Sequence, residues 1–257
     1  MQFQLLIEGK CIERSNREIT LEPENDIRIV SGGQPEKTSV QAAENQDWAN
    51  LGYYKEQNEL LGISSNIERK IVFIGDSITE EWNNLYPEFF SRKNFINRGI
   101  GGQTTPQILV RFKPDAIDLR PDVIIILAGT NDIAGNTGPA TVKMITDNIF
   151  SMAELAMINN IRVVISSILP VYEYPWNDNV MDPPKTIASI NGIIKEYIQE
   201  HDLLYLDYYS SMVDEHKGLR KEYTNDGVHP NEAGYRLMCV IAESIISQAL
   251  GRKDSSY

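Results

Sequence analysis

The chain has 257 residues, of which 42% are hydrophobic and 23% charged, an ordinary composition for a globular protein that buries one core plus a small appendage. Its 24 basic and 36 acidic residues give a formal net charge of -12, which disfavours binding to nucleic acid and to anionic lipid surfaces. The longest apolar run, around residues 123–128, is far shorter than the roughly 18 to 20 residues of a membrane-spanning helix, so no integral membrane association is expected.

The two cysteines and the first ten residues are the features that predict the cellular compartment of the protein. Cys11 and Cys239 lie far apart, with no Cys-x-x-Cys or Cys/His cluster, so neither a disulfide framework nor a zinc site is predicted. Residues 1–10 lack a positive segment followed by an apolar one, and hence a secretory signal. We expect a cytoplasmic protein if the sequence is complete, and a secreted or periplasmic one if a leader has been removed. Whether the chain forms a homo-oligomer stays open.

The N-terminal part differs in pattern from the rest. Short alternating apolar stretches, separated by glycine, asparagine and proline, predict a small β-extension over residues 1–45, ahead of a main domain over 46–257. Apolar residues then take helical spacing over residues 47–61, which predicts a helix leading into the main domain.

After Lys70, buried strands alternate with amphipathic helices, the pattern of an α/β protein whose parallel sheet is wrapped by helices. Strands are predicted near 70–74, 95–98, 123–128, 161–168 and 203–206. Helices are predicted at about 78–85, 105–112, 139–159, 186–200 and 231–250.

The segment 171–184 is too long and too aromatic for a plain connection. Such loops often line a site, so Tyr172, Tyr174 and Trp176 are candidate substrate-binding residues that would stack on a sugar or close over it. The alternative is a disordered surface excursion without a function.

A candidate nucleophile follows the first buried strand. Gly75 permits a tight turn after the apolar run 71–74, which places Ser77 at the carboxyl edge of the sheet, where α/β proteins bind their ligands. Alternatively, Asp76 or Ser77 merely caps the next helix.

A serine hydroxyl needs a base, and the chain has three histidines. His201 and His216 lie in polar surroundings typical of the surface. His229 precedes the last helix and follows Asp226 by three residues, a spacing that lets the carboxylate orient the imidazole. Alternatively, the Asp-Gly pair is an ordinary turn and Asn231 caps the helix.

Two further segments offer donors to a developing oxyanion. The glycines of residues 97–105 let main-chain N–H groups approach a ligand, and no Gly-Lys-Ser/Thr follows to make the segment a phosphate loop. Asn131 follows the third strand, and its side-chain amide is a neutral donor of the kind that stabilises tetrahedral oxyanions, although Thr-Asn-Asp is also common turn chemistry.

All four segments fall at strand ends or helix starts, and their combination resembles the SGNH hydrolases, also called the GDSL esterase and lipase family. The matching residues are Gly75-Asp76-Ser77, Asn97 through Gly102, Gly129-Thr130-Asn131-Asp132 and Asp226-Gly227-Val228-His229-Pro230. The resemblance runs over about residues 47–250. The lead-in at 47–51 and the segment 75–82 look most like the platelet-activating-factor-acetylhydrolase-like branch.

The resemblance implies a role for each matching residue. Ser77 would be the nucleophile, with His229 as its base and Asp226 as the partner of the imidazole. The main-chain N–H groups of Ser77 and Gly102 and the amide of Asn131 would hold the oxyanion.

The roles of two neighbouring residues, Gly101 and Asp76, stay open. Gly101 competes with Gly102 for the glycine role, and both Gly101 and Asp76 are candidate substrate-binding residues.

For the whole chain, the resemblance implies a flavodoxin-like three-layer α/β/α fold with a sheet of about five strands, and neither a metal nor an organic cofactor. The expected activity is that of a serine esterase cleaving short-chain, especially acetyl, oxygen esters, with acetylated sugars among the small-molecule substrates. Two alternatives remain: a lysophospholipase or thioesterase for longer acyl chains, and a noncatalytic carbohydrate-binding protein on a hydrolase fold.

Overall fold

The computed structural model describes residues 17–21, 27–31, 47–63, 69–91 and 94–251. The chain divides into two compact units, Met1–Gln46 and Asp47–Tyr257. In the first unit, β1 (Arg17–Leu21) pairs antiparallel with β2 (Ile27–Ser31), as expected of a β-extension.

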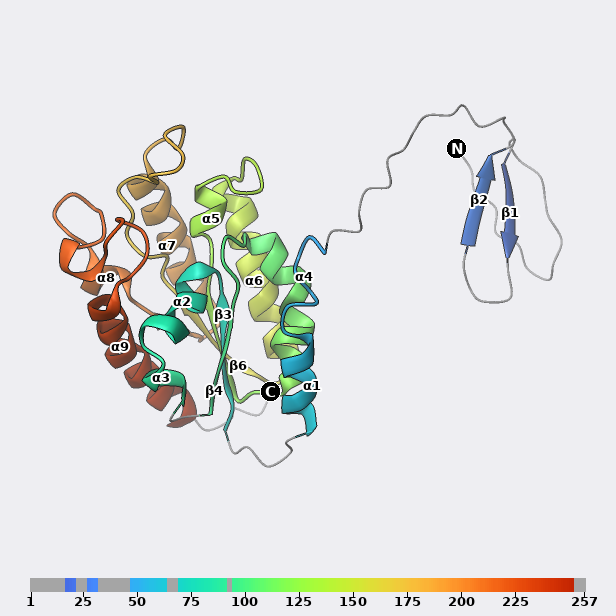
Figure 1. The fold of residues 1–257 in the computed structure, drawn as a ribbon, viewed down its shortest axis with the longest axis horizontal. Helices are drawn as coiled ribbons and strands as arrows, with labels where there is room; N and C mark the ends of the chain where they lie inside the picture. The colour runs from blue at the N-terminus through green and yellow to red at the C-terminus, as the bar shows by residue number, and fades with distance from the viewer. Residues whose placement is uncertain (1–16, 22–26, 32–46, 64–68, 92–93, 252–257) are drawn as a thin grey trace. The chain divides into compact units, whose positions relative to one another are not determined.

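A parallel sheet of five strands organises the second unit, in the order β4-β3-β5-β6-β7 (Figure 1). The strands are β3 (Ile71–Gly75), β4 (Phe95–Gly99), β5 (Val123–Leu127), β6 (Arg162–Ser166) and β7 (Leu204–Leu206). The chain adds β4 on one side of β3 and then returns to add β5 on the other. Ligands bind at the carboxyl ends of strands where the order reverses in this way, which is here beside β3.

Helices cover both faces of the sheet and make three layers (Figure 1). The core on one face includes residues of α4 (Thr105–Asp115), α6 (Val142–Ile158) and α7 (Pro183–Glu200), and α1 (Lys55–Ile63) packs on α4. The core on the other face includes residues of α2 (Ser77–Leu85), α3 (Glu88–Ser91), α8 (Tyr209–Met212) and α9 (Glu232–Gly251). The predicted three-layer α/β fold is therefore confirmed.

Strand β3 shows why the central strands are continuous apolar runs. Val72 and Ile74 enter one core, while Ile71 and Phe73 enter the other, because successive side chains point to opposite faces. All are buried. The apolar run 71–74 therefore packs into the cores on both faces of the sheet, just before Ser77 in the chain.

The predicted helix over 47–61 begins later than expected, at Lys55. Residues 47–54 form turns instead, since Asn50 adopts a positive φ of 56° and Asp47 Oδ2 accepts the N–H of Gly52 at 2.7 Å. These turns lie near the glycine-rich segment, because the carbonyl of Ala49 accepts a hydrogen bond from the side chain of Gln103.

Two expectations concern the cysteines and the membrane. Cys239 is buried in α9, whereas Cys11 lies outside the described residues. Among the helices that the structure describes, none has the length and apolar character needed to cross a bilayer.

Candidate functional site

Ser77 is the first residue of α2, at the carboxyl end of β3. Gly75, the last residue of β3, leaves no room for a side chain, because a Cβ there would collide with the carbonyl oxygen of Leu127. Asp76 caps the helix, its Oδ1 accepting the N–H of Ile78 at 3.0 Å. The capping alternative therefore holds for Asp76 and leaves the Ser77 hydroxyl free for another partner.

That partner is His229, 152 residues later in the chain. Ser77 Oγ lies 3.0 Å from His229 Nε2, and His229 Nδ1 lies 2.7 Å from Asp226 Oδ2. A carboxylate only accepts, so Nδ1 carries the proton and Nε2 faces the serine hydroxyl as an acceptor. Asp226 Oδ1 accepts the N–H groups of Val228 and His229 at 2.9 and 2.8 Å, which fixes the carboxylate.

The pKa of Asp226 is lowered although the carboxylate is partly buried. Burial alone raises the pKa, but hydrogen bonds from the His229 ring and from the N–H groups of His229 and Val228 outweigh it. Asp226 therefore stays ionised through the neutral range, and its favourable contribution to folding is lost only when the pH falls through this lowered pKa.

The segment that carries Asp226 and His229 is also a turn and a helix cap. Gly227 adopts a φ of +85°, and Asn231 Oδ1 accepts the N–H of Gly234 at 3.0 Å. One turn later, the Tyr235 hydroxyl donates to the Ile78 carbonyl at 2.9 Å, which joins the start of α9 to the start of α2. Turn chemistry and the candidate triad thus occur together.

A glutamate distinguishes Gly101 from Gly102. The N–H of Gly101 donates to Glu80 Oε2 at 2.8 Å, and Glu80 Oε1 accepts the hydroxyl of Tyr53 at 2.6 Å. Gly102 adopts a φ of +74°, and within the described part of the chain its N–H has no hydrogen-bond partner. The geometry therefore favours Gly102 as the donor to a ligand.

Asn131 is buried in the short helix α5 (Thr130–Ile133). Its Nδ2 donates to the Gln103 carbonyl at 3.0 Å, and its Oδ1 accepts from Asn136 Nδ2 at 2.9 Å. Helix α5 is tied to α4, because Asp132 accepts the N–H and the hydroxyl of Thr105 at 2.8 and 2.6 Å. One Nδ2 hydrogen of Asn131 is left for a ligand.

The fully buried Arg111 of α4 connects the end of β3 with the glycine-rich segment. Its guanidinium donates to Asp115 at 3.2 Å, to Gln103 Oε1 at 2.5 Å and to the Gly75 carbonyl at 2.8 Å. Gly75 precedes Ser77 by two residues, and Gln103 follows Gly102. Arg111 was not predicted as a site residue, because a basic residue on an amphipathic helix usually faces solvent.

The aromatic loop reaches the candidate triad at Trp176. The Trp176 ring lies 6.1 Å from the His229 imidazole at an interplanar angle of 29° and is 48% exposed. Tyr172 is 59% exposed. Tyr174 is 2% exposed, and its hydroxyl lies 2.9 Å from Thr130 Oγ1, so its ring offers no face to a sugar. The interpretation of Tyr174 as a stacking residue is therefore corrected.

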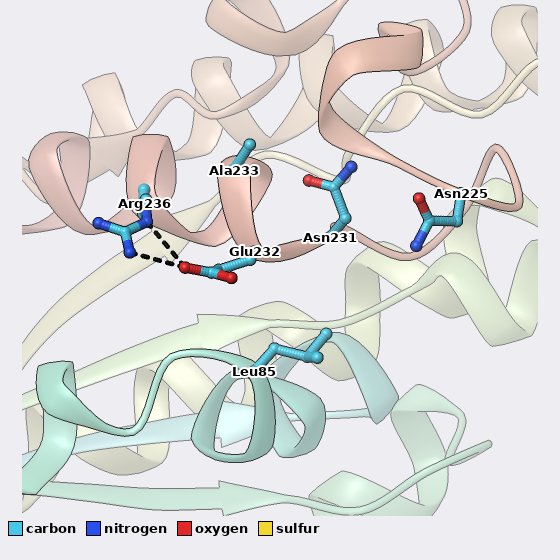
Figure 2. A pocket seen from close by; sticks show the side chains of 6 residues that line it. All are labelled: Leu85, Asn225, Asn231, Glu232, Ala233 and Arg236. Carbon is cyan, nitrogen blue, oxygen red and sulfur yellow. Dashed lines mark hydrogen bonds and ion pairs between the residues drawn. The ribbon is translucent and has the colours of Figure 1, made fainter.

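Two cavities lie outside the triad itself. The larger, about 490 Å³, is lined by Leu85, Asn225, Asn231, Glu232, Ala233 and Arg236, and Figure 2 shows the Arg236–Glu232 ion pair on its wall. The other, about 460 Å³, has Trp48, Asp132 and Met144 among its lining residues. Neither includes Ser77 or His229.

The other two histidines are exposed, as expected. His201 Nδ1 lies 2.9 Å from the Tyr197 carbonyl, and His216 lies beside Glu215. Among the residues that the structure describes, no three His, Cys, Asp or Glu side chains are grouped to hold a metal ion.

The pKa of the Asp76 carboxyl, beside Ser77, is raised by burial. Its complete burial raises the pKa to about 7, although the Ile78 N–H and the nearby His229 act in the opposite direction. Between about pH 4 and 7, the folded protein therefore holds a proton that the unfolded chain has lost, and this group's contribution to stability falls as the pH rises through that window.

We expect Asp76→Asn to be more stable relative to wild type at pH 8 than at pH 4.5, by about 2–4 kcal/mol, since it removes the ionised form and retains a cap. Urea unfolding at the two pH values measures the difference. Asp147→Asn, the same change on an exposed side chain, is the control. A stability difference that does not vary with pH would contradict the raised pKa.

Comparison with known proteins gives consistent results. The sequence profile of the GDSL-like Lipase/Acylhydrolase family matches residues 73–237, well over half of the chain. Among solved structures, a GDSL-like lipase from Bacteroides thetaiotaomicron is 42% identical, with a TM-score of 0.76 over 78% of this chain and 98% of that one. A candidate acylhydrolase from Bacteroides fragilis is 44% identical, with a TM-score of 0.77 over 80% and 99%.

A more distant match comes from curated proteins. The platelet-activating factor acetylhydrolase IB subunit alpha1 of Rattus norvegicus is 24% identical over 197 residues, which cover 74% of this chain and 80% of that protein. The profile match includes the nucleophile, the glycine segment, the Asn131 segment and His229. The chain therefore belongs to the GDSL-like lipase/acylhydrolase family of ester hydrolases.

Proposed function

We propose that this ester hydrolase cleaves short-chain, especially acetyl, oxygen esters through a covalent acyl-enzyme at Ser77. The observation that carries the proposal is the continuous pair of contacts from Ser77 Oγ to His229 Nε2 at 3.0 Å and from His229 Nδ1 to Asp226 at 2.7 Å. This arrangement is that of a serine nucleophile with an oriented base.

In the first step, Ser77 Oγ attacks the ester carbonyl as His229 Nε2 takes its proton. The tetrahedral oxyanion accepts hydrogen bonds from the N–H groups of Ser77 and Gly102 and from Asn131 Nδ2. His229 then protonates the leaving alcohol, and Asp226 stabilises the imidazolium in the meantime. Water repeats the sequence and releases the acid and the free serine.

The acyl preference rests on relatives and not on a measured cavity. The curated relatives are named acetylhydrolases, which supports an acetyl group as the acyl part. Removal of acetyl needs only a small space beside the nucleophile, so wild type should act on the smallest acyl esters.

The alcohol part is proposed to lie against Trp176. Its half-exposed ring stands beside His229, the group that protonates the leaving alcohol, so a sugar ring stacked there would place its ester oxygen near Nε2. Exposed Tyr172 in the same loop is a second candidate contact, whereas Tyr174 and Asp76 are buried.

A panel of substrates tests both parts of the proposal. We expect kcat/KM for p-nitrophenyl acetate to exceed that for the octanoyl ester by at least about tenfold, with the butyryl ester between them, because a small acyl site excludes the longer chain. Acetate release from acetylated glucose and xylose tests the sugar part, with Trp176→Ala as the variant. A preference for octanoyl would indicate the lysophospholipase or thioesterase alternative.

A further inference from the structure

We propose that Asn136 is a positioning residue of the oxyanion hole: its single amide group fixes both the Asn131 side chain and the Gly102 peptide. Asn136 Nδ2 donates to Asn131 Oδ1 at 2.9 Å and to the Gly102 carbonyl at 3.2 Å. An amide nitrogen has two hydrogens, and both are used here. Asn136 therefore holds the two donors and does not itself donate to the substrate.

The contact with Asn131 decides which way its carboxamide points. The Asn136 amide faces Oδ1, while Asn131 Nδ2 donates to the Gln103 carbonyl. Turning the Asn131 carboxamide over would set its NH₂ against the Asn136 NH₂ and its oxygen against the Gln103 carbonyl. Asn136 thus keeps the Nδ2 of Asn131 directed at the site.

The contact with the Gly102 carbonyl restrains the main chain around the Gly102 N–H. The Gly102 N–H belongs to the peptide between Gly101 and Gly102. The preceding peptide is fixed by Glu80, which accepts the Gly101 N–H at 2.8 Å, and the following one by Asn136. The Gln103 N–H of the following peptide also donates, to the Ile100 carbonyl at 3.4 Å. Because Gly102 has a φ of +74° and no side chain to restrain it, these hydrogen bonds set the direction of its N–H.

Asn136 is itself held in place although it is exposed. Its main-chain N–H donates to the Asn131 carbonyl at 3.0 Å, which closes the turn after α5. The adjacent Thr137 joins the same two loops through its hydroxyl, 3.1 Å from Thr104 Oγ1, but touches neither oxyanion donor. Thr137 therefore provides a matched control for a purely structural link between the loops.

This inference rests on the proposed oxyanion hole, and Asn136→Ala tests it. With p-nitrophenyl acetate as substrate, we expect kcat to fall about 10- to 100-fold with KM within about twofold, because donors that are displaced lose their effect mainly in the transition state. Thr137→Val should keep kcat within about twofold of wild type. Thermal unfolding of both variants reports on folding.

A second readout separates positioning from loosening of the loops. Phenylboronic acid bonded to the serine places a negative oxygen in the hole, so its inhibition constant should weaken in Asn136→Ala by a factor similar to the loss in kcat/KM. Asn136→Asp should be slower than Asn136→Ala, because it sets carboxylate oxygens against two acceptor oxygens and adds negative charge beside the oxyanion.

Three results would overturn the inference: wild-type kcat in Asn136→Ala, equal losses in Asn136→Ala and Thr137→Val, or an unchanged boronate constant in a slow Asn136→Ala. Ser77→Ala in the same assay keeps this outcome distinct from that of the proposed function. If Ser77→Ala is inactive while Asn136→Ala is normal, only the positioning role fails. If Ser77→Ala retains wild-type activity, the proposed function fails and the positioning role fails with it.

Discussion

Ser77→Ala should lower kcat for p-nitrophenyl acetate at least about a thousandfold while the unfolding temperature stays close to that of wild type. On the proposed mechanism, the variant loses the atom that forms the acyl-enzyme bond. Among the residues that the structure describes, the half-buried Ser77 hydroxyl forms one side-chain hydrogen bond, with His229 at 3.0 Å. His229→Ala should show a similar loss, since the two groups act as a unit. Steady-state kinetics and circular dichroism measure both quantities.

Two control variants carry the same changes at exposed positions. Ser247→Ala removes an exposed hydroxyl that donates to the Glu243 carbonyl, and His216→Ala removes an exposed imidazole. Both should retain activity and covalent labelling by a fluorophosphonate, whereas Ser77→Ala should lose the label. Wild-type protein that neither labels nor hydrolyses esters would indicate the noncatalytic sugar-binding alternative, and active Ser77→Ala would refute the assigned nucleophile.

Arg111→Leu should destabilise the fold by about 3–5 kcal/mol, because it leaves a buried carboxylate without its cation. Arg111 and Asp115 are both fully buried, and the guanidinium also satisfies Gln103 and the Gly75 carbonyl. Leucine fills part of the volume but donates no hydrogen bond. Urea unfolding measures the loss of stability. We expect kcat to fall as well, because the Gly75 carbonyl, two residues before Ser77, loses its hydrogen bond from Arg111.

An exposed pair of the same spacing supplies the control. Lys143 and Asp147 form an i,i+4 ion pair on α6, with side chains 82% and 54% exposed, so Lys143→Ala should change stability by less than about 1 kcal/mol. Arg111→Leu combined with Asp115→Leu should recover part of the loss, since no buried charge then remains unpaired. Wild-type stability in Arg111→Leu alone would contradict this account.

The sheet could be predicted because its strands carry their own signal. The runs ending at Gly75 and Leu127 are buried along their whole length, and the run ending at Ser166 is buried from Val163 onward, so the position of each depends little on the rest of the chain. The short helices α3, α5 and α8 span four residues each, about one turn, and have no period to detect. The residues before α1 have helical spacing but lie in turns fixed by Asp47.

Candidate site residues could be predicted where a residue's chemistry coincides with its place at a strand end or a helix start, as for Ser77, Asn131 and His229. Glu80, Arg111 and Asn136 were not predicted, because their importance comes from contacts with residues 21, 36 and 34 positions away in the chain. Such pairings depend on the fold, and a single sequence shows only ordinary polar residues on helices and turns.

The bond between Tyr235 and the Ile78 carbonyl has a consequence for how the protein matures. It joins the first turn of the last helix to the first turn after the nucleophile, across 157 positions. On the proposed mechanism, a nascent polypeptide emerging from the ribosome stays chemically inert until the segment that carries His229 and α9 docks. Gain of esterase signal during synthesis would thus report the docking of this segment.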